Sequence, residues 1–171
     1  MAFKTDCGGI ALTVDAKLLY RDTTWKTRLK QIGKHDNEVI IVTYSLCQFD
    51  FISRIISQRD GGKGITIICN SKFEANAYCI KKNFPDLKIY VNPTAHAKMA
   101  LIGPATVWLS SENLGKVKDT FDASIGIESK EAYDHYHAQI EHLLCSKHTR
   151  EIKEALGLAA FPFLTFMWLR L

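Results

Sequence analysis

A histidine and a lysine stand two residues apart at the head of an apolar run, His96-Ala-Lys98-Met-Ala-Leu-Ile-Gly103. The run predicts a strand, and side chains two residues apart in a strand point to the same face. The imidazole of His96 and the ammonium of Lys98 are therefore expected to project together. A nucleophilic imidazole beside a fixed cation suits attack on a phosphate ester, because the cation stabilises the negative charge that builds on the oxygens.

A second polar group follows the next predicted strand. A Ser-Ser-Glu-Asn segment supplies a hydroxyl at Ser111 and a carboxamide at Asn113, and Asp122 then begins a further apolar strand. The hydroxyl and the amide can hold phosphate oxygens while histidine attacks phosphorus. The carboxylate of Asp122 can bind the far ring nitrogen of a histidine and fix its tautomer. Together with His96 and Lys98, these residues form a coherent set for phosphoryl transfer.

The elements that must position these residues follow from hydrophobic patterning. Strands are expected at residues 39–45, 65–69, 87–91, 98–102, 106–109 and 123–127, and helices at 50–58, 71–84 and 130–145, with a further helix at 23–32 as an option. Ser71, followed three residues later by Glu74, resembles a capping box. Strand–helix alternation followed by consecutive strands predicts an α/β fold with a mixed, mostly parallel central sheet flanked by helices on both faces.

Length and composition limit the architecture to one domain. The chain has 171 residues, of which 47% are hydrophobic and 23% charged, as in ordinary soluble globular proteins. Residues 1–155 are expected to form the domain, and the apolar segment 156–171 to pack on its core or on a dimer partner. That segment is too short for the roughly 20 residues of a membrane span, and it lacks the cationic face of an interfacial helix, so no stable membrane insertion is expected.

Net charge and cysteine spacing give weaker evidence about partners, location and metal sites. A net charge of +4 is compatible with a polyanionic partner and equally with a weakly basic surface. The five cysteines are scattered without a CxxC pair, which favours a reducing, cytoplasmic location, and the N-terminus lacks the apolar core of a signal peptide. His142 and Cys145 lie three apart on a predicted helix, but this spacing fits no strong zinc pattern. We expect no metal site there.

The ordered motifs resemble those of a known family. His96-x-Lys98, an apolar strand and then Ser110-Ser111-x-Asn113 are similar to the phospholipase D superfamily pattern HxK(x)4D followed by GSxN. Gly103 stands where the pattern has aspartate, and Ser110 stands where it has glycine.

The resemblance extends beyond these motifs. Residues 39–45 resemble the family's strand before its first helix, and Asp122 falls where short bacterial nucleases of the superfamily carry glutamate. It therefore covers residues 35–145 and implies a phospholipase D-like fold.

The resemblance also implies a mechanism. His96 would be the nucleophile that forms a phosphohistidine intermediate, while Lys98, Ser111 and Asn113 would bind the phosphate and Asp122 would orient a histidine. The family mechanism uses no metal or other cofactor. It needs two histidines, and family members of this length obtain the second by homodimerisation around a two-fold axis. A homodimer with a shared active site is therefore expected.

The expected function is that of a metal-independent phosphodiesterase, and a nuclease acting on DNA or RNA is favoured because lipid-processing relatives usually carry both motifs in a longer chain. Lys116 and Lys118 would contact backbone phosphates. Two alternatives remain open. One is a hydrolase of phospholipid or another small phosphodiester. The other is a catalytically impaired nucleic-acid-binding protein, for which Gly103 is the motivating residue.

Overall fold

The computed structural model describes residues 13–20, 28, 30–33, 37–114 and 122–153. Its strands are β1 (Ala16–Tyr20), β2 (Val39–Thr43), β3 (Ile65–Asn70), β4 (Lys88–Asn92), β5 (Met99–Ile102), β6 (Thr106–Ser110), β7 (Ala123–Glu128) and β8 (Arg150–Glu151). Its helices are α2 (Phe49–Ile56), α3 (Glu74–Asn83) and α4 (Lys130–Leu144), with 3₁₀ turns η2 (Asp60–Gly62) and η3 (Ser71–Phe73).

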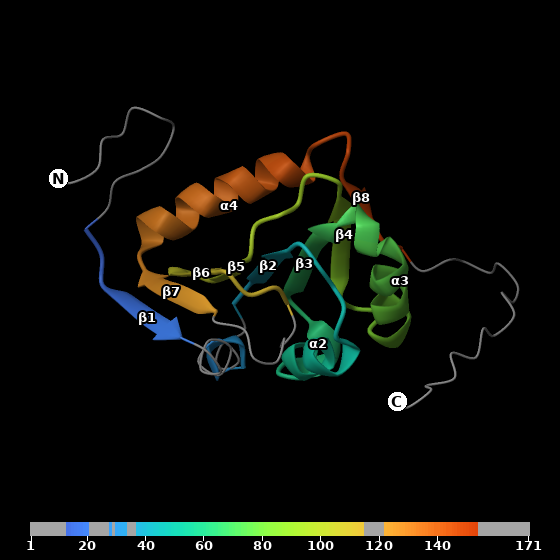
Figure 1. Cartoon of the computed structure of the whole chain (residues 1–171), viewed down its shortest axis with the longest axis horizontal. Helices are drawn as coiled ribbons and strands as arrows, with labels where there is room; N and C mark the ends of the chain where they lie inside the picture. The colour runs from blue at the N-terminus through green and yellow to red at the C-terminus, as the bar shows by residue number, and fades with distance from the viewer. Residues whose placement is uncertain (1–12, 21–27, 29, 34–36, 115–121, 154–171) are drawn as a thin grey trace, which may run out of the picture.

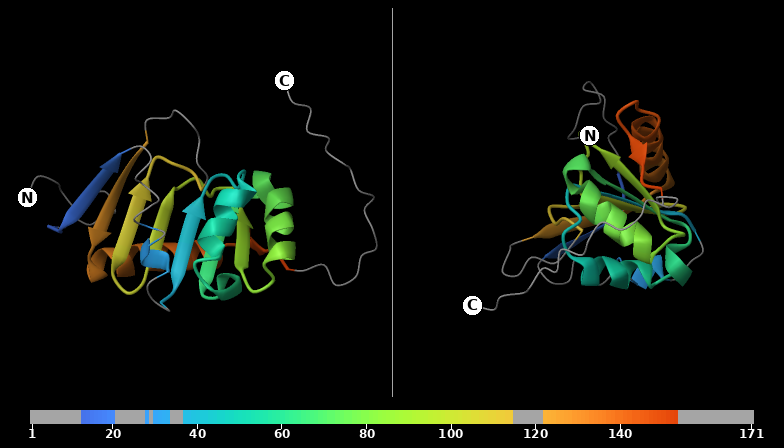
Figure 2. Two further views of the ribbon diagram at one scale, coloured as in Figure 1. Left: turned by 90° about the horizontal axis from the view of Figure 1, so that it is seen from below. Right: turned by 90° about the vertical axis from the view of Figure 1, so that its right-hand side faces the viewer.

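The strands form one sheet in the order β1-β7-β6-β5-β2-β3-β4-β8. Helix α4 crosses one face of this sheet, and α2 and α3 cover the other (Figure 1). The same three layers are visible from two further sides (Figure 2). The α/β fold with helices on both faces is therefore confirmed.

The prediction of a mostly parallel sheet was wrong. Only the β2–β3 and β3–β4 pairs are parallel, and the five other pairs are antiparallel. The reason is the length of the connections: residues 103–105 join β5 to β6, whereas a parallel pair needs a crossover of about a dozen residues or more. The edge strands β1 and β8, which the sequence analysis did not predict, are antiparallel as well.

The core has one hydrophobic cluster on each face of the sheet. In β2, Val39 and Ile41 point to the cluster beneath α2 and α3, while Ile40 and Val42 point to the cluster beneath α4. All five residues of β2 are buried, as expected for a strand between two helical layers. The central strands therefore form a rigid base for the residues that follow them.

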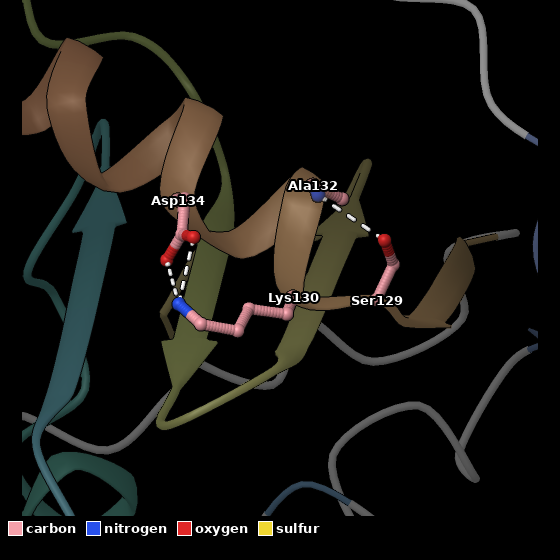
Figure 3. Close-up of polar contacts among 4 residues, drawn as sticks. All are labelled: Ser129, Lys130, Ala132 and Asp134. Carbon is pink, nitrogen blue, oxygen red and sulfur yellow. Dashed lines mark hydrogen bonds and ion pairs between the residues drawn. The ribbon is translucent and has the colours of Figure 1, made fainter.

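Helix α4 begins at the predicted residue. The Ser129 side chain accepts a hydrogen bond from the backbone N–H of Ala132 at 3.2 Å, which caps the helix (Figure 3). The ammonium of Lys130, at the start of the helix, pairs with Asp134 one turn further along at 2.7 Å (Figure 3). The apolar side chains of α4 belong to or pack against the cluster on this face: Tyr133, Tyr136, Ile140, Leu143 and Leu144.

The expected cap of the second helix was wrong. Residues Ser71–Phe73 form the 3₁₀ turn η3, and α3 begins at Glu74. The capping side chain is Asn70, whose Oδ1 accepts the N–H of Lys72 at 3.1 Å. An asparagine at the end of a strand competes well for such turns, because its short side chain bonds the backbone two residues on.

Some expectations fall on residues outside the described set. The expected helix at 23–32 is described only at Arg28 and 30–32, which are helical. The apolar segment 156–171 and residues 1–12 lie outside the described residues.

Four described cysteines are free, namely Cys47, Cys69, Cys79 and Cys145. Burial raises the pKa of the Cys69 thiol to about 12. Of the helices described, none has the length and apolar character needed to cross a membrane.

Candidate active site

The residues with candidate chemistry converge at one edge of the sheet. Lys98 precedes β5 and pairs with Ser110 at the end of β6 through a backbone hydrogen bond of 2.9 Å. Ser111 pairs in turn with Ala123 at the start of β7, N–H to carbonyl, at 3.0 Å. This is also the edge where the parallel strands β2 and β3 end, since β2 runs antiparallel to β5. Carboxyl ends of parallel strands are the usual place for ligand sites in α/β sheets.

His96 lies in the loop between β4 and β5, not in a strand as predicted. Its side chain is exposed, and its ring centroid is 5.0 Å from that of Tyr44, which follows β2. Tyr44 contacts Phe73 edge-on at 5.5 Å. The imidazole therefore contacts the ring of Tyr44, which Phe73 supports from another side, and is otherwise exposed.

Two buried asparagines hold the loop that carries His96. Asn70, at the end of β3, donates from Nδ2 to the carbonyls of Pro93 at 2.8 Å and Ala95 at 3.1 Å. Asn92, at the end of β4, accepts at Oδ1 from the N–H and the hydroxyl of Thr94, each at 2.7 Å. Neither asparagine was predicted as a functional residue, and the signal in the sequence is a polar side chain at the end of a buried strand.

Lys98 is half-buried, and its ammonium donates to the backbone carbonyl of His96 at 3.1 Å. Its side chain shares a narrow crevice with Thr43, Glu112 and Arg28. The contact of the Lys98 ammonium is with the backbone of His96 and not with its imidazole. The predicted joint projection of the two side chains therefore stays a prediction.

Ser111 and Asp122 are in direct contact. The Ser111 hydroxyl donates to Oδ1 of Asp122 at 2.8 Å and accepts the N–H of Ala123 at 3.1 Å. The Asp122 carboxylate thus contacts this serine, and its contact with a histidine stays a prediction. For Ser111 to donate to a phosphate oxygen, its hydroxyl must rotate away from Asp122.

Asn113 carries an unsatisfied buried oxygen. Its Oδ1 is shielded from solvent and has no hydrogen-bond partner in the described part of the chain. The neighbouring backbone is well fixed, since the N–H of Leu114 donates to the hydroxyl of Thr43 at 3.0 Å. A buried polar atom without a partner is costly, and the unused capacity here is that of an acceptor, since the atom is the carbonyl oxygen of the amide.

A buried cation lies behind this edge. Arg28 is 1% exposed, and its Nη2 donates to the hydroxyls of Ser110 at 3.2 Å and Ser124 at 2.5 Å. Burial lowers its pKa to about 10, an effect that the nearby Glu112 carboxylate opposes. Sequence analysis did not select Arg28, because an isolated arginine in an unclear segment carries no signal by itself.

Gly103 lies at the other end of β5. Its N–H donates to the carbonyl of Glu38 at 2.9 Å, and a Cβ at this position would lie 3.3 Å from the hydroxyl of Tyr133. Gly103 follows Lys98 by five positions along an extended chain, or roughly 16 Å. An aspartate at position 103, which the motif expects, would therefore not lie among the residues at the candidate site.

Lys116 and Lys118 lie outside the described residues, so their predicted contact with backbone phosphates stays a prediction. Among residues 13–20, 28, 30–33, 37–114 and 122–153, no group of three or more His, Cys, Asp or Glu side chains is arranged to hold a metal ion.

Comparisons with known proteins agree on the fold. No family model and no curated protein matches the sequence. Among solved structures, the phospholipase D family member Nuc from Salmonella typhimurium is similar with a TM-score of 0.68 and 12% identity, over 83% of this chain and 100% of that one. NucT from Helicobacter pylori gives a TM-score of 0.61 and 18% identity, over 77% and 96%.

A longer protein shares part of the fold. Phosphatidylserine synthase from Haemophilus influenzae is similar with a TM-score of 0.64 and 12% identity, over 81% of this chain and 40% of the synthase. The chain therefore has the phospholipase D-like fold that its motifs predict, and it matches the short members over nearly their whole length.

Proposed function

We propose that this chain, with its phospholipase D-like fold, is a metal-independent phosphodiesterase whose main substrate is DNA. The observation that supports the proposal is the convergence of His96, Lys98, Ser111, Asn113 and Asp122 at one sheet edge. The fold similarity to Nuc and NucT, which covers 100% and 96% of those chains, supports a nuclease as the first candidate. The proposal includes a cytoplasmic location, which the scattered cysteines favour.

In the proposed reaction, a ring nitrogen of His96 attacks phosphorus and forms a P–N bond as the P–O bond to the leaving group breaks. A second histidine protonates the leaving oxygen. Water, deprotonated by that same histidine, then attacks phosphorus and breaks the P–N bond, which restores His96. Lys98 and the amide of Asn113 stabilise the charge on the non-bridging oxygens.

The second histidine is proposed to be His96 of another copy of this chain. Of the other described histidines, His135, His137 and His142 belong to α4 on a face of the sheet. His148 follows that helix and is exposed, next to Thr149, whose hydroxyl accepts a hydrogen bond from Asn92 at the end of β4. A homodimer with the two His96 side chains facing each other would complete the site, and Asp122 would then orient the partner's imidazole.

The test is cleavage of plasmid DNA with and without EDTA. We expect equal rates in both, because no step requires a metal. A loss of activity with the chelator would contradict the phosphohistidine mechanism. Parallel assays with phosphatidylcholine and bis-p-nitrophenyl phosphate separate a nuclease from a lipid or general phosphodiester hydrolase. DNA binding without cleavage of any substrate would identify an impaired binding protein instead.

Restoring the motif aspartate is expected to leave activity unchanged. Gly103→Asp alters the far end of β5, beside Tyr133 and the carbonyl of Glu38, so kcat/KM should stay within about threefold of wild type, as distant sites act independently. Steady-state cleavage of bis-p-nitrophenyl phosphate measures this. An increase of about tenfold or more would show that Gly103 limits the site despite its distance.

A further inference from the structure

Arg28 is a buried charge that the proposed reaction does not use. Its side chain comes from a helical segment ahead of β2, whereas every residue assigned a chemical role lies between His96 and Asp122. Removing a guanidinium from water is costly unless its hydrogen bonds are replaced. A fully buried arginine therefore needs a structural or functional account.

The guanidinium joins the ends of two strands. Ser110 and Ser124 are directly paired in the β6–β7 ladder, and Nη2 of Arg28 donates to both hydroxyls. The two hydroxyls are also 2.9 Å from each other. The guanidinium carbon lies 5.7 Å from the ring centroid of Trp108, which fixes its plane further.

These contacts lead directly to the phosphate-binding candidates. The Ser110 hydroxyl that accepts from Arg28 also accepts the N–H of Glu112 at 3.0 Å, so it sets the turn between Ser111 and Asn113. On the other strand, Ala123 stands next to Ser124 and donates its N–H to Ser111. Arg28 thus contacts one side chain on each of the two strands that position Ser111.

Charge supports the same arrangement. Glu112, the residue between Ser111 and Asn113, is close enough to Arg28 to interact with it electrostatically. Lys98 lines the same crevice as both. Attraction between Arg28 and Glu112 favours a turn in which Glu112 faces the interior.

We propose that Arg28 is a positioning residue for the candidate active site, which holds Ser111 and Asn113 in place through Ser110, Ser124 and Glu112. The inference about catalysis rests on the proposed phosphodiesterase function, whereas the inference about the geometry of the turn does not. Arg28 touches no substrate in this account and acts only through its neighbours.

The test compares Arg28→Lys with wild type and with Lys30→Gln, an exposed neighbour in the same segment. Lysine keeps the charge but lacks the planar fork that joins two hydroxyls. We expect kcat on bis-p-nitrophenyl phosphate to fall about 10- to 100-fold, as for a small misplacement of catalytic groups, with KM within about threefold and Lys30→Gln unchanged. A wild-type kcat in a folded Arg28→Lys protein would overturn the positioning role.

Hydrogen exchange tests the geometry without substrate. In Arg28→Lys, the amides of Glu112 and Ala123 should exchange at least about tenfold faster, while those of β2 and β3 keep their protection. Unchanged exchange at these two amides would overturn the proposal. If wild type cleaves no phosphodiester, the proposed function fails, yet faster exchange would still support the anchoring of the turn. Arg28→Met, which removes the charge, should give the same exchange pattern if it folds.

Discussion

His96→Asn is expected to lower phosphodiester cleavage at least about 1000-fold, because asparagine keeps the polar character of the side chain but cannot form a phosphoramidate intermediate. The side chain is exposed at the sheet edge, and its loop is held by Asn70 through backbone carbonyls. The fold should therefore be unaffected. Initial rates on plasmid DNA with EDTA present, together with a thermal melt, measure both effects.

The matched control is His142→Asn, the same substitution at an exposed histidine in the last turn of α4. It should retain wild-type rates. Loss of activity in both variants would point to a general effect of histidine substitution. Full activity of His96→Asn would exclude His96 as the nucleophile and with it the proposed mechanism.

The same variant tests the shared site. If each reaction needs His96 from two copies, mixing wild type with excess His96→Asn should convert active homodimers into inactive heterodimers, and activity should fall with the square of the wild-type fraction. A linear fall would show that each chain works alone. Light scattering on the same samples gives the oligomeric state.

The type and order of the polar residues selected five candidate site residues from the sequence, and their roles stay predictions: His96, Lys98, Ser111, Asn113 and Asp122. The geometry that was assumed for them is a separate matter. The strand assumed for His96 was wrong, since its loop is shaped by Asn70, whose hydrogen bonds span 23 and 25 residues of sequence. Contacts between residues so far apart in the sequence leave no periodic pattern from which they could be predicted.

The contacts of Arg28 were even harder to predict from local sequence patterns. Its partners Ser110 and Ser124 lie 82 and 96 residues away, and a single arginine has no motif. Gly103, to which the motif comparison gave weight, lies at the far end of β5, and its effect on activity stays a prediction. Sequence order indicated which groups come together, but only the register of β5, β6 and β7 shows which end of each strand they occupy.

The register also accounts for Gly126, a glycine in the middle of β7. Gly126 is paired with Trp108 of β6, and the indole ring lies across it. A Cβ at Gly126 would stand 2.6 Å from the nearest ring carbon, much closer than van der Waals contact. Trp108 is buried and donates from Nε1 to Gln31 at 2.7 Å, so the ring has little freedom to move.

Gly126→Val is therefore expected to destabilise the fold by about 3 kcal/mol, the cost of severe overpacking, and Gly126→Ala by less. Urea unfolding followed by tryptophan fluorescence and circular dichroism measures the change. In Gly126→Ala/Trp108→Leu, circular dichroism should show a loss smaller than the sum of the single variants, because the smaller side chain removes the clash. Strict additivity would mean that the indole does not cause the destabilisation, and that glycine is needed here for a different reason.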